Sequence, residues 1–96
     1  MKVCFKRVVK AGGGSSSRDV WLSHPMELPF VPPVGMEVCD GDWCGIVDKL
    51  VYDDGWVFAF EEEERPYKSR TDEEIEAEVA ECIDAGWQRS ERVLAT

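Results

Sequence analysis

Two Asp-Gly dipeptides divide residues 34–60 into three short apolar runs, and this pattern constrains the fold more than any other feature of the chain. Asp-Gly tolerates the positive φ angles of a tight turn, so Asp40-Gly41 and Asp54-Gly55 each predict a two-residue loop between antiparallel strands. Moving the first loop to Gly41-Asp42 changes the paired residues but not the faces on which their side chains lie. The segment therefore predicts a three-stranded β meander.

The alternation of side chains within these strands predicts one shared apolar face. Successive residues of a strand point to opposite sides, so nine bulky side chains are expected to face a common core. These residues are Val34, Met36, Val38, Trp43, Val47, Val51, Trp56, Phe58 and Phe60. The opposite face mixes polar and apolar side chains, which favours partial cover by a helix. Lys49 and Asp53 interrupt the apolar side, and this predicts a sheet that curls and brings them to a rim.

The segments before the meander extend the sheet. Residues 2–10 alternate apolar and basic side chains, a pattern typical of a strand with one solvated face, and we expect this strand at an edge. Residues 20–30 also alternate, but Pro25 and Pro29 lack the N–H that a ladder needs and restrict the segment to an edge or a broken strand. The Gly/Ser run at 12–17 predicts a flexible loop, and it lacks the Gly-Lys-Ser/Thr ending of a phosphate-binding loop.

Residues 72–85 carry the best helix pattern. Thr71 and Glu74 match a capping box, and apolar residues recur at helical spacing along one face. These apolar residues are Ile75, Val79, Cys82 and Ile83. Gly86 supplies a stop signal, and the tryptophan after it is expected to fold back on the last turn. Residues 87–94 then allow a short final strand.

Together these patterns predict a single α+β domain over residues 1–96, with a strongly bent antiparallel sheet of four to five strands and one C-terminal amphipathic helix packed across it. Ninety-six residues suffice for one core but not for separate catalytic and binding lobes. No apolar run approaches the roughly 20 residues of a membrane-spanning helix, and the charged N-terminal segment does not resemble a signal peptide. We therefore expect a cytoplasmic protein without membrane contact.

The four cysteines, Cys4, Cys39, Cys44 and Cys82, are expected to be free thiols because a chain without a signal peptide stays in a reducing compartment. Cys39 and Cys44 are expected to be near neighbours across the first turn. In an alternative interpretation, Cys4 and Cys82 join them in a four-thiolate zinc site, although the Cys-x2-Cys pairs of common zinc sites are missing. The favoured interpretation is small buried side chains that hold no metal and no cofactor.

No group of residues carries a catalytic signature. His24 is the only histidine, and a lone histidine beside a proline is more typical of a packing or rim position than of a general base. Pairs of carboxylates such as Asp40/Asp42 and Asp53/Asp54 arise without design when 20 of 96 residues are acidic. The sequence therefore favours a protein that is not an enzyme.

The charge of the chain is strongly polarised. The first 18 residues hold five basic and no acidic side chains, whereas residues 19–96 hold six basic and 20 acidic ones, a net charge of −14. An acidic body repels the phosphates of nucleic acids, which are normally bound by basic patches. Direct nucleic-acid binding is therefore disfavoured, and a basic protein surface is the expected partner.

Acidic residues after the third strand and on the helix form a negative ridge, and two aromatic residues are candidates for exposed contacts beside it. Trp21 lies on the opposite parity to its apolar neighbours, and Tyr67 lies in the charged connection before the helix. The full predicted contact set is Trp21, Glu61, Glu62, Glu63, Glu64, Tyr67, Asp72, Glu73 and Glu76. The simpler interpretation of this ridge is a solubilising surface.

The run PPVGMEVCDGDWCGIVDKLVYDDGWVFAF resembles the consecutive strands of small SH3-like barrels. This resemblance implies a binding module, but the ALYDY-type segment of peptide-binding SH3 domains is missing, so recognition of proline-rich ligands is not implied. In size, acidity and layout the chain is similar to accessory proteins of phages and mobile elements, including anti-CRISPR and anti-restriction inhibitors. That similarity implies an inhibitor that covers a basic nucleic-acid-binding surface; the alternative is a metal-binding or thiol-based protein using Cys39 and Cys44.

Overall fold

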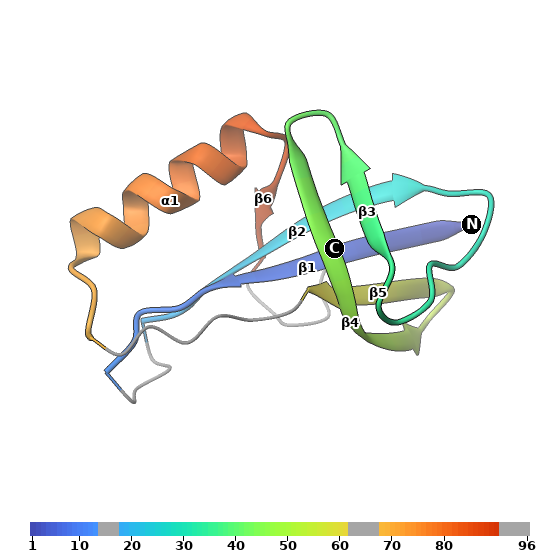
Figure 1. The fold of residues 1–96 in the computed structure, drawn as a ribbon, viewed down its shortest axis with the longest axis horizontal. Helices are drawn as coiled ribbons and strands as arrows, with labels where there is room; N and C mark the ends of the chain where they lie inside the picture. Colours follow the sequence, from blue (N-terminus) through green and yellow to red (C-terminus); the bar gives the residue numbers. More distant parts are fainter. Residues whose placement is uncertain (14–17, 62–67, 91–96) are drawn as a thin grey trace.

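Six strands and one helix make up the computed structural model, which describes residues 1–13, 18–61 and 68–90. In chain order the elements are β1 (Lys2–Val9), β2 (Val20–Glu27), β3 (Glu37–Asp40), β4 (Trp43–Asp53), β5 (Trp56–Glu61), α1 (Asp72–Asp84) and β6 (Gln88–Arg89). The strands form one curled sheet in the order β3-β4-β5-β1-β2-β6, and β4 runs steeply across the direction of β1 (Figure 1). The predicted α+β class is confirmed.

Strand β1 departs from the prediction in its position and in its pairing. It lies inside the sheet, antiparallel to β2 and parallel to β5, with Phe5 opposite His24 on one side and Ala59 on the other. The predictions of an edge position for residues 2–10, of an antiparallel sheet and of four to five strands are therefore wrong. A parallel pair has no tight turn between its strands, so no local signal in the sequence marks the contact between β1 and β5.

Both predicted hairpins form. In the β4–β5 turn Asp53 pairs with Trp56, and the loop residues Asp54 and Gly55 have φ angles of 49° and 82°, as a type I′ turn requires. In the β3–β4 turn Asp40 pairs with Trp43, so the loop is Gly41-Asp42, the second of the two registers expected from the sequence. Gly41 has a φ of 61° and is followed by a residue with negative φ, which is the pattern of a type II′ turn.

The nine bulky side chains predicted to share one face lie on two faces. The register of β4 against β5 shifts between Val47 and Lys49, which indicates a β-bulge. A bulge adds one residue to one strand and reverses the parity of every later side chain. Trp43 and Val47, before the bulge, therefore belong to a different apolar cluster from the predicted face residues after it, which are Val51, Trp56, Phe58 and Phe60. The single-face prediction is wrong for this reason. Val34 is exposed to solvent and belongs to neither cluster.

The larger cluster lies between the sheet and α1, and the smaller one covers the other face of the sheet. The buried members of the larger cluster are Val3, Phe5, Val9, Ala11, Leu22, Trp43, Val47, Val57, Ala59, Ile75, Val79, Cys82 and Trp87. The smaller cluster buries Cys4, Phe58 and Phe60, with Trp21, Val51 and Trp56 packed against them. Burial on both faces explains why β5 reads as a nearly continuous apolar run.

Helix α1 begins and ends as the sequence predicts, to within one residue. At its C-terminal end, Trp87 N–H donates to Cys82 O (3.0 Å) and Gly86 N–H to Ile83 O (3.0 Å), a Schellman motif that requires the positive φ of Gly86, 105°. Trp87 is 2% exposed and does fold back on the helix. Across the described part of the chain, α1 is too short and too polar to cross a membrane.

Candidate functional site

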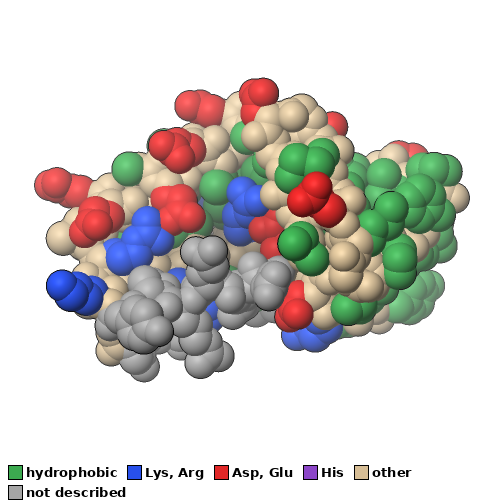
Figure 2. Space-filling model, in the orientation of Figure 1, with side chains coloured by type: hydrophobic (Ala, Val, Ile, Leu, Met, Phe, Trp, Pro, Cys, Tyr) green, Lys and Arg blue, Asp and Glu red, His purple; other side chains and the backbone are tan. Residues whose placement is uncertain are grey.

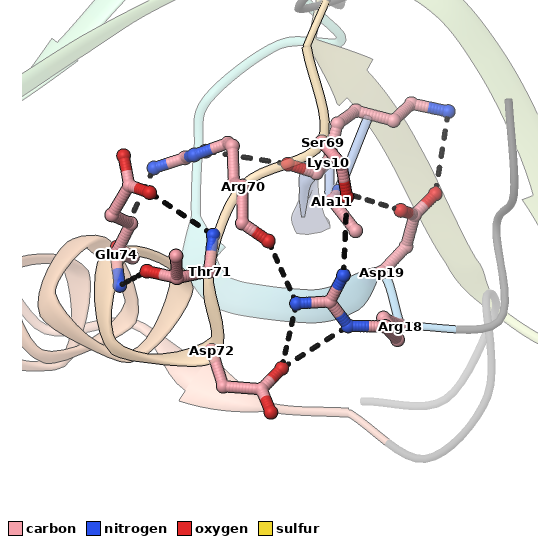
Figure 3. Close-up of polar contacts among 9 residues, drawn as sticks. All are labelled: Lys10, Ala11, Arg18, Asp19, Ser69, Arg70, Thr71, Asp72 and Glu74. Atoms are coloured by element: carbon pink, nitrogen blue, oxygen red, sulfur yellow. Dashed lines mark hydrogen bonds and ion pairs between the residues drawn. The ribbon is translucent and has the colours of Figure 1, made fainter. Parts of the chain in front are cut away.

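The first turn of α1 is fixed by a reciprocal capping box. Thr71 Oγ1 accepts a hydrogen bond from Glu74 N–H (3.2 Å), and Glu74 Oε1 accepts one from Thr71 N–H (3.0 Å) (Figure 3). The hydrogen bond from Thr71 N–H, and to a lesser extent the Thr71 hydroxyl, favours the ionised carboxylate and lowers the pKa of Glu74 below its ordinary value. The helix therefore starts at a defined residue.

Two arginines tie this turn to the segments around the β1–β2 connection (Figure 3). Arg18 donates from Nη2 to Arg70 O (2.7 Å) and to Asp72 Oδ1 (2.7 Å), and from Nε to the same oxygen (3.1 Å). Arg70 donates to Lys10 O (3.3 Å) and forms an ion pair with Glu78. The basic residues near the N-terminus are thus used in part to hold the acidic helix in place.

The outer face of α1 keeps a set of acidic residues that form no ion pair within the described residues. Asp72 is paired with Arg18, and Glu76 is paired with Arg89 (2.6 Å). The remaining exposed acids on this face are Glu73, Glu81 and Asp84, which we call the acidic face. Acidic side chains follow the helix along the upper edge of the molecule in Figure 2.

Glu61, a predicted contact residue, lies in a nearly buried ion pair and not on an exposed ridge. Arg7 donates to both of its carboxylate oxygens (2.6 and 2.8 Å), and the Glu61 side chain is only 10% exposed. A Cβ added at Gly45 would collide with this carboxylate, so the glycine gives the carboxylate its space. Burial opposes the charge of Arg7, but the hydrogen bonds that Arg7 donates to Glu61 and Cys82, together with the attraction of both groups, outweigh it and raise the pKa of Arg7.

The other predicted contact residues divide into three groups. Trp21 is half-buried, with its ring edge-on to Phe60 at a centroid distance of 6.0 Å, so it contributes mainly to the smaller apolar cluster. Glu73 is exposed as expected, while Asp72 and Glu76 are exposed but paired with arginines. Glu62, Glu63, Glu64 and Tyr67 lie outside the described residues.

The cysteines are not arranged as predicted. Cys39 and Cys44 lie directly opposite each other on the β3–β4 hairpin and form a disulfide, so the expectation of four free thiols is wrong. Cys4 and Cys82 are free and buried in different apolar clusters, on opposite faces of the sheet. The alternative four-thiolate zinc site is therefore also wrong. Burial raises the pKa of the Cys4 thiol, although Lys6 and a backbone hydrogen bond partly oppose this.

His24 occupies a packing position, as predicted, and also joins three parts of the fold. Its ring packs edge-on against the ring of Trp43. Nδ1 lies 2.9 Å from Gly86 O, and Nε2 lies 3.0 Å from Asp40 Oδ2. Both partners accept hydrogen bonds, so only the doubly protonated ring can donate to both.

Sequence reasoning missed the Arg7–Glu61 pair and the bond between His24 and Asp40. Each joins residues on elements far apart in the chain, so neither leaves a local spacing signal. Comparisons with protein-family models, curated proteins and solved structures found no match.

Proposed function

We propose that the protein is a non-enzymatic interaction module whose acidic face binds a basic protein surface that handles nucleic acid. The observation that supports this most directly is that Glu73, Glu81 and Asp84 are exposed without an ion pair within the described residues, whereas arginines neutralise other acids of the same helix. Small residues, Ala77 and Ala80, lie between them on the exposed surface and leave room for a partner's long basic side chains.

The rigidity of α1 supports the same proposal. The capping box and Arg18 fix its first turn, while the Schellman motif and His24 fix its end. A surface that is ordered before binding loses less conformational entropy when the partner arrives. The acidic face is therefore presented by a backbone that does not need to fold on contact.

Net charge supports a partner of opposite sign. The chain carries −9 at neutral pH, and a charge of this size accelerates association with a basic surface while it repels nucleic-acid phosphates. The hairpins from β3 to β5 also resemble the consecutive strands of SH3-like binding modules. We propose that this curled sheet serves as the support for the helix, in the manner of an inhibitor that covers a nucleic-acid-binding surface.

The proposal is tested with two variants of equal net charge. One removes the acidic face by Glu73→Gln, Glu81→Gln and Asp84→Asn. The matched control changes three exposed acids of the β3–β4 turn and of β4, which form no ion pair among the described residues, by Asp42→Asn, Asp48→Asn and Asp53→Asn. Proteins captured from a host lysate by the wild type are identified, purified and titrated with each variant and with duplex DNA.

We expect the acidic-face variant to bind the captured protein about tenfold more weakly, since three exposed charge pairs contribute roughly 0.5 kcal/mol each. The control should stay within about twofold of wild type, and duplex DNA should compete with the wild-type protein. Equal weakening by both variants, or binding that DNA does not affect, contradicts the proposal.

A further inference from the structure

The β3–β4 hairpin brings three metal-ligating side chains together on one exposed face. Cys39 lies opposite Cys44 with a Cα–Cα distance of 4.0 Å, and Glu37, two residues before Cys39, lies on the same side of the hairpin. The Sγ of Cys39 is 3.9 Å from Oε1 of Glu37. One donor atom from each of Glu37, Cys39 and Cys44 lies within 4.8 Å of the others, and all three residues are exposed.

We propose that this hairpin is a redox-gated site for a thiophilic divalent cation such as Zn²⁺, closed when Cys39 and Cys44 form the disulfide and open when they are reduced. Zn²⁺ prefers thiolate, imidazole and carboxylate ligands in a tetrahedral arrangement. Two thiolates and one carboxylate from the hairpin supply three positions and leave the fourth for solvent. Ligands at ordinary zinc distances are about 3.7 Å apart. The distance of 3.9 Å between Cys39 Sγ and Glu37 Oε1 is close to this, and the two sulfur atoms move apart when their bond is reduced.

The redox step needs a thiol reductant. Two thiol molecules, or one dithiol, give two electrons and two protons to the Cys39–Cys44 bond, which yields two cysteine thiols and one external disulfide. Metal binding then displaces the two thiol protons, because the thiolate is the ligand. In the oxidised hairpin the sulfur atoms are bonded to each other and supply no thiolate.

The hairpin is held in register by contacts that do not depend on the disulfide. Gly35 N–H donates to Val47 O (2.7 Å), and Val47 N–H donates to Met36 O (3.0 Å). The side chain of Val38 packs against the larger apolar cluster. The two thiols are therefore expected to stay opposite each other after reduction.

The surroundings favour a cation and separate this site from the other cysteines. Asp42 is exposed in the turn, and the whole molecule is strongly acidic, so the local potential concentrates cations near the hairpin. Cys4 and Cys82 are buried in the two apolar clusters and cannot reach it.

The test uses Zn²⁺ alone as the probe, in competition with a chromogenic chelator. Full-length protein is compared in its oxidised form and after reduction by a phosphine, and free thiols are counted in denaturant before and after reduction. Cys39→Ser/Cys44→Ser keeps the two buried thiols and therefore reports any binding by them. Glu37→Gln is compared with Glu81→Gln, which removes the same charge from α1.

We expect two free thiols before reduction and four after it, and about one equivalent of Zn²⁺ bound only by the reduced wild type. Affinity should fall at least tenfold in Glu37→Gln and stay within about twofold in Glu81→Gln. Four free thiols in the oxidised sample, equal binding by oxidised and reduced protein, or binding by Cys39→Ser/Cys44→Ser as tight as wild type would each overturn the proposal. Equal affinity of Glu37→Gln and Glu81→Gln for Zn²⁺ would show that Glu37 is not a ligand.

Discussion

At the scale of single residues, the ion pair between Arg7 and Glu61 is the most consequential polar contact inside the fold. It links β1 to β5, and the guanidinium lies over the ring of Trp87, 4.4 Å from the ring centroid. Because both side chains are mostly removed from water, the loss of one partner leaves the other charge poorly compensated. The pair therefore matters more than any surface ion pair of the helix.

We predict that Glu61→Gln lowers the free energy of unfolding by about 2 kcal/mol, because it leaves the buried Arg7 guanidinium without its carboxylate. Urea unfolding followed by tryptophan fluorescence measures this change. The matched control is Glu76→Gln, which breaks the exposed pair with Arg89 and should cost about 0.5 kcal/mol or less. Equal losses in the two variants would show that Glu61 is not effectively buried.

At the scale of elements, α1 depends on its capping box. The pKa of Glu74 is lowered in the folded state by hydrogen bonds with Thr71. A carboxylate whose folded pKa is depressed contributes stability that is present above its unfolded pKa and is lost as the pH falls through its folded pKa. The first turn should therefore loosen in acid, below the ordinary glutamate pKa of about 4.3.

We predict that Thr71→Ala lowers the free energy of unfolding by about 1 kcal/mol at neutral pH, because the N-cap oxygen is lost. The Glu74 titration midpoint should return only part of the way to its ordinary value, because the backbone N–H at position 71 still donates to the carboxylate. Carboxyl chemical shifts from NMR give the midpoint, and urea unfolding gives the stability. Thr71→Ser retains the hydroxyl and serves as the control, with both quantities close to wild type. Wild-type stability in Thr71→Ala would contradict the role of the capping box.

The elements that the sequence predicts well are those with local signals. Thr71, Glu74 and Gly86 mark the ends of α1, and the Asp-Gly pairs mark both hairpins. The β-bulge after Val47 has no comparable signal, because it depends on how β4 fits against β5. That one extra residue moved half of the predicted core to the other face of the sheet.

The candidate site shows the same division between local and long-range information. The proximity of Cys39 and Cys44 follows from one turn and was predictable, whereas their disulfide contradicts an expectation based on compartment. The exposure of Glu73 follows from helix periodicity. The burial of Glu61 depends on Arg7, more than fifty positions away, and on the space left by Gly45.

At the scale of the whole molecule, two N-terminal arginines are paired with acids, whereas several acids of α1 face solvent. The N-terminal segment is basic, but Arg7 and Arg18 form ion pairs with acidic residues later in the chain. Their charges therefore help to hold the fold together. The acids that face solvent on α1 remain, and they give this side of the molecule the negative charge on which the proposed function rests (Figure 2).

Whether the acidic face is the binding surface is best measured as the rate of association between the protein and its captured basic partner, followed by stopped flow from about 20 mM to 500 mM salt. We expect a wild-type rate that falls at least tenfold over this range, a much weaker salt dependence when Glu73, Glu81 and Asp84 are neutralised, and near wild-type behaviour when Asp42, Asp48 and Asp53 are neutralised. Rates that do not change with salt, or that respond equally to both sets of substitutions, would contradict the assignment of the acidic face as the binding surface.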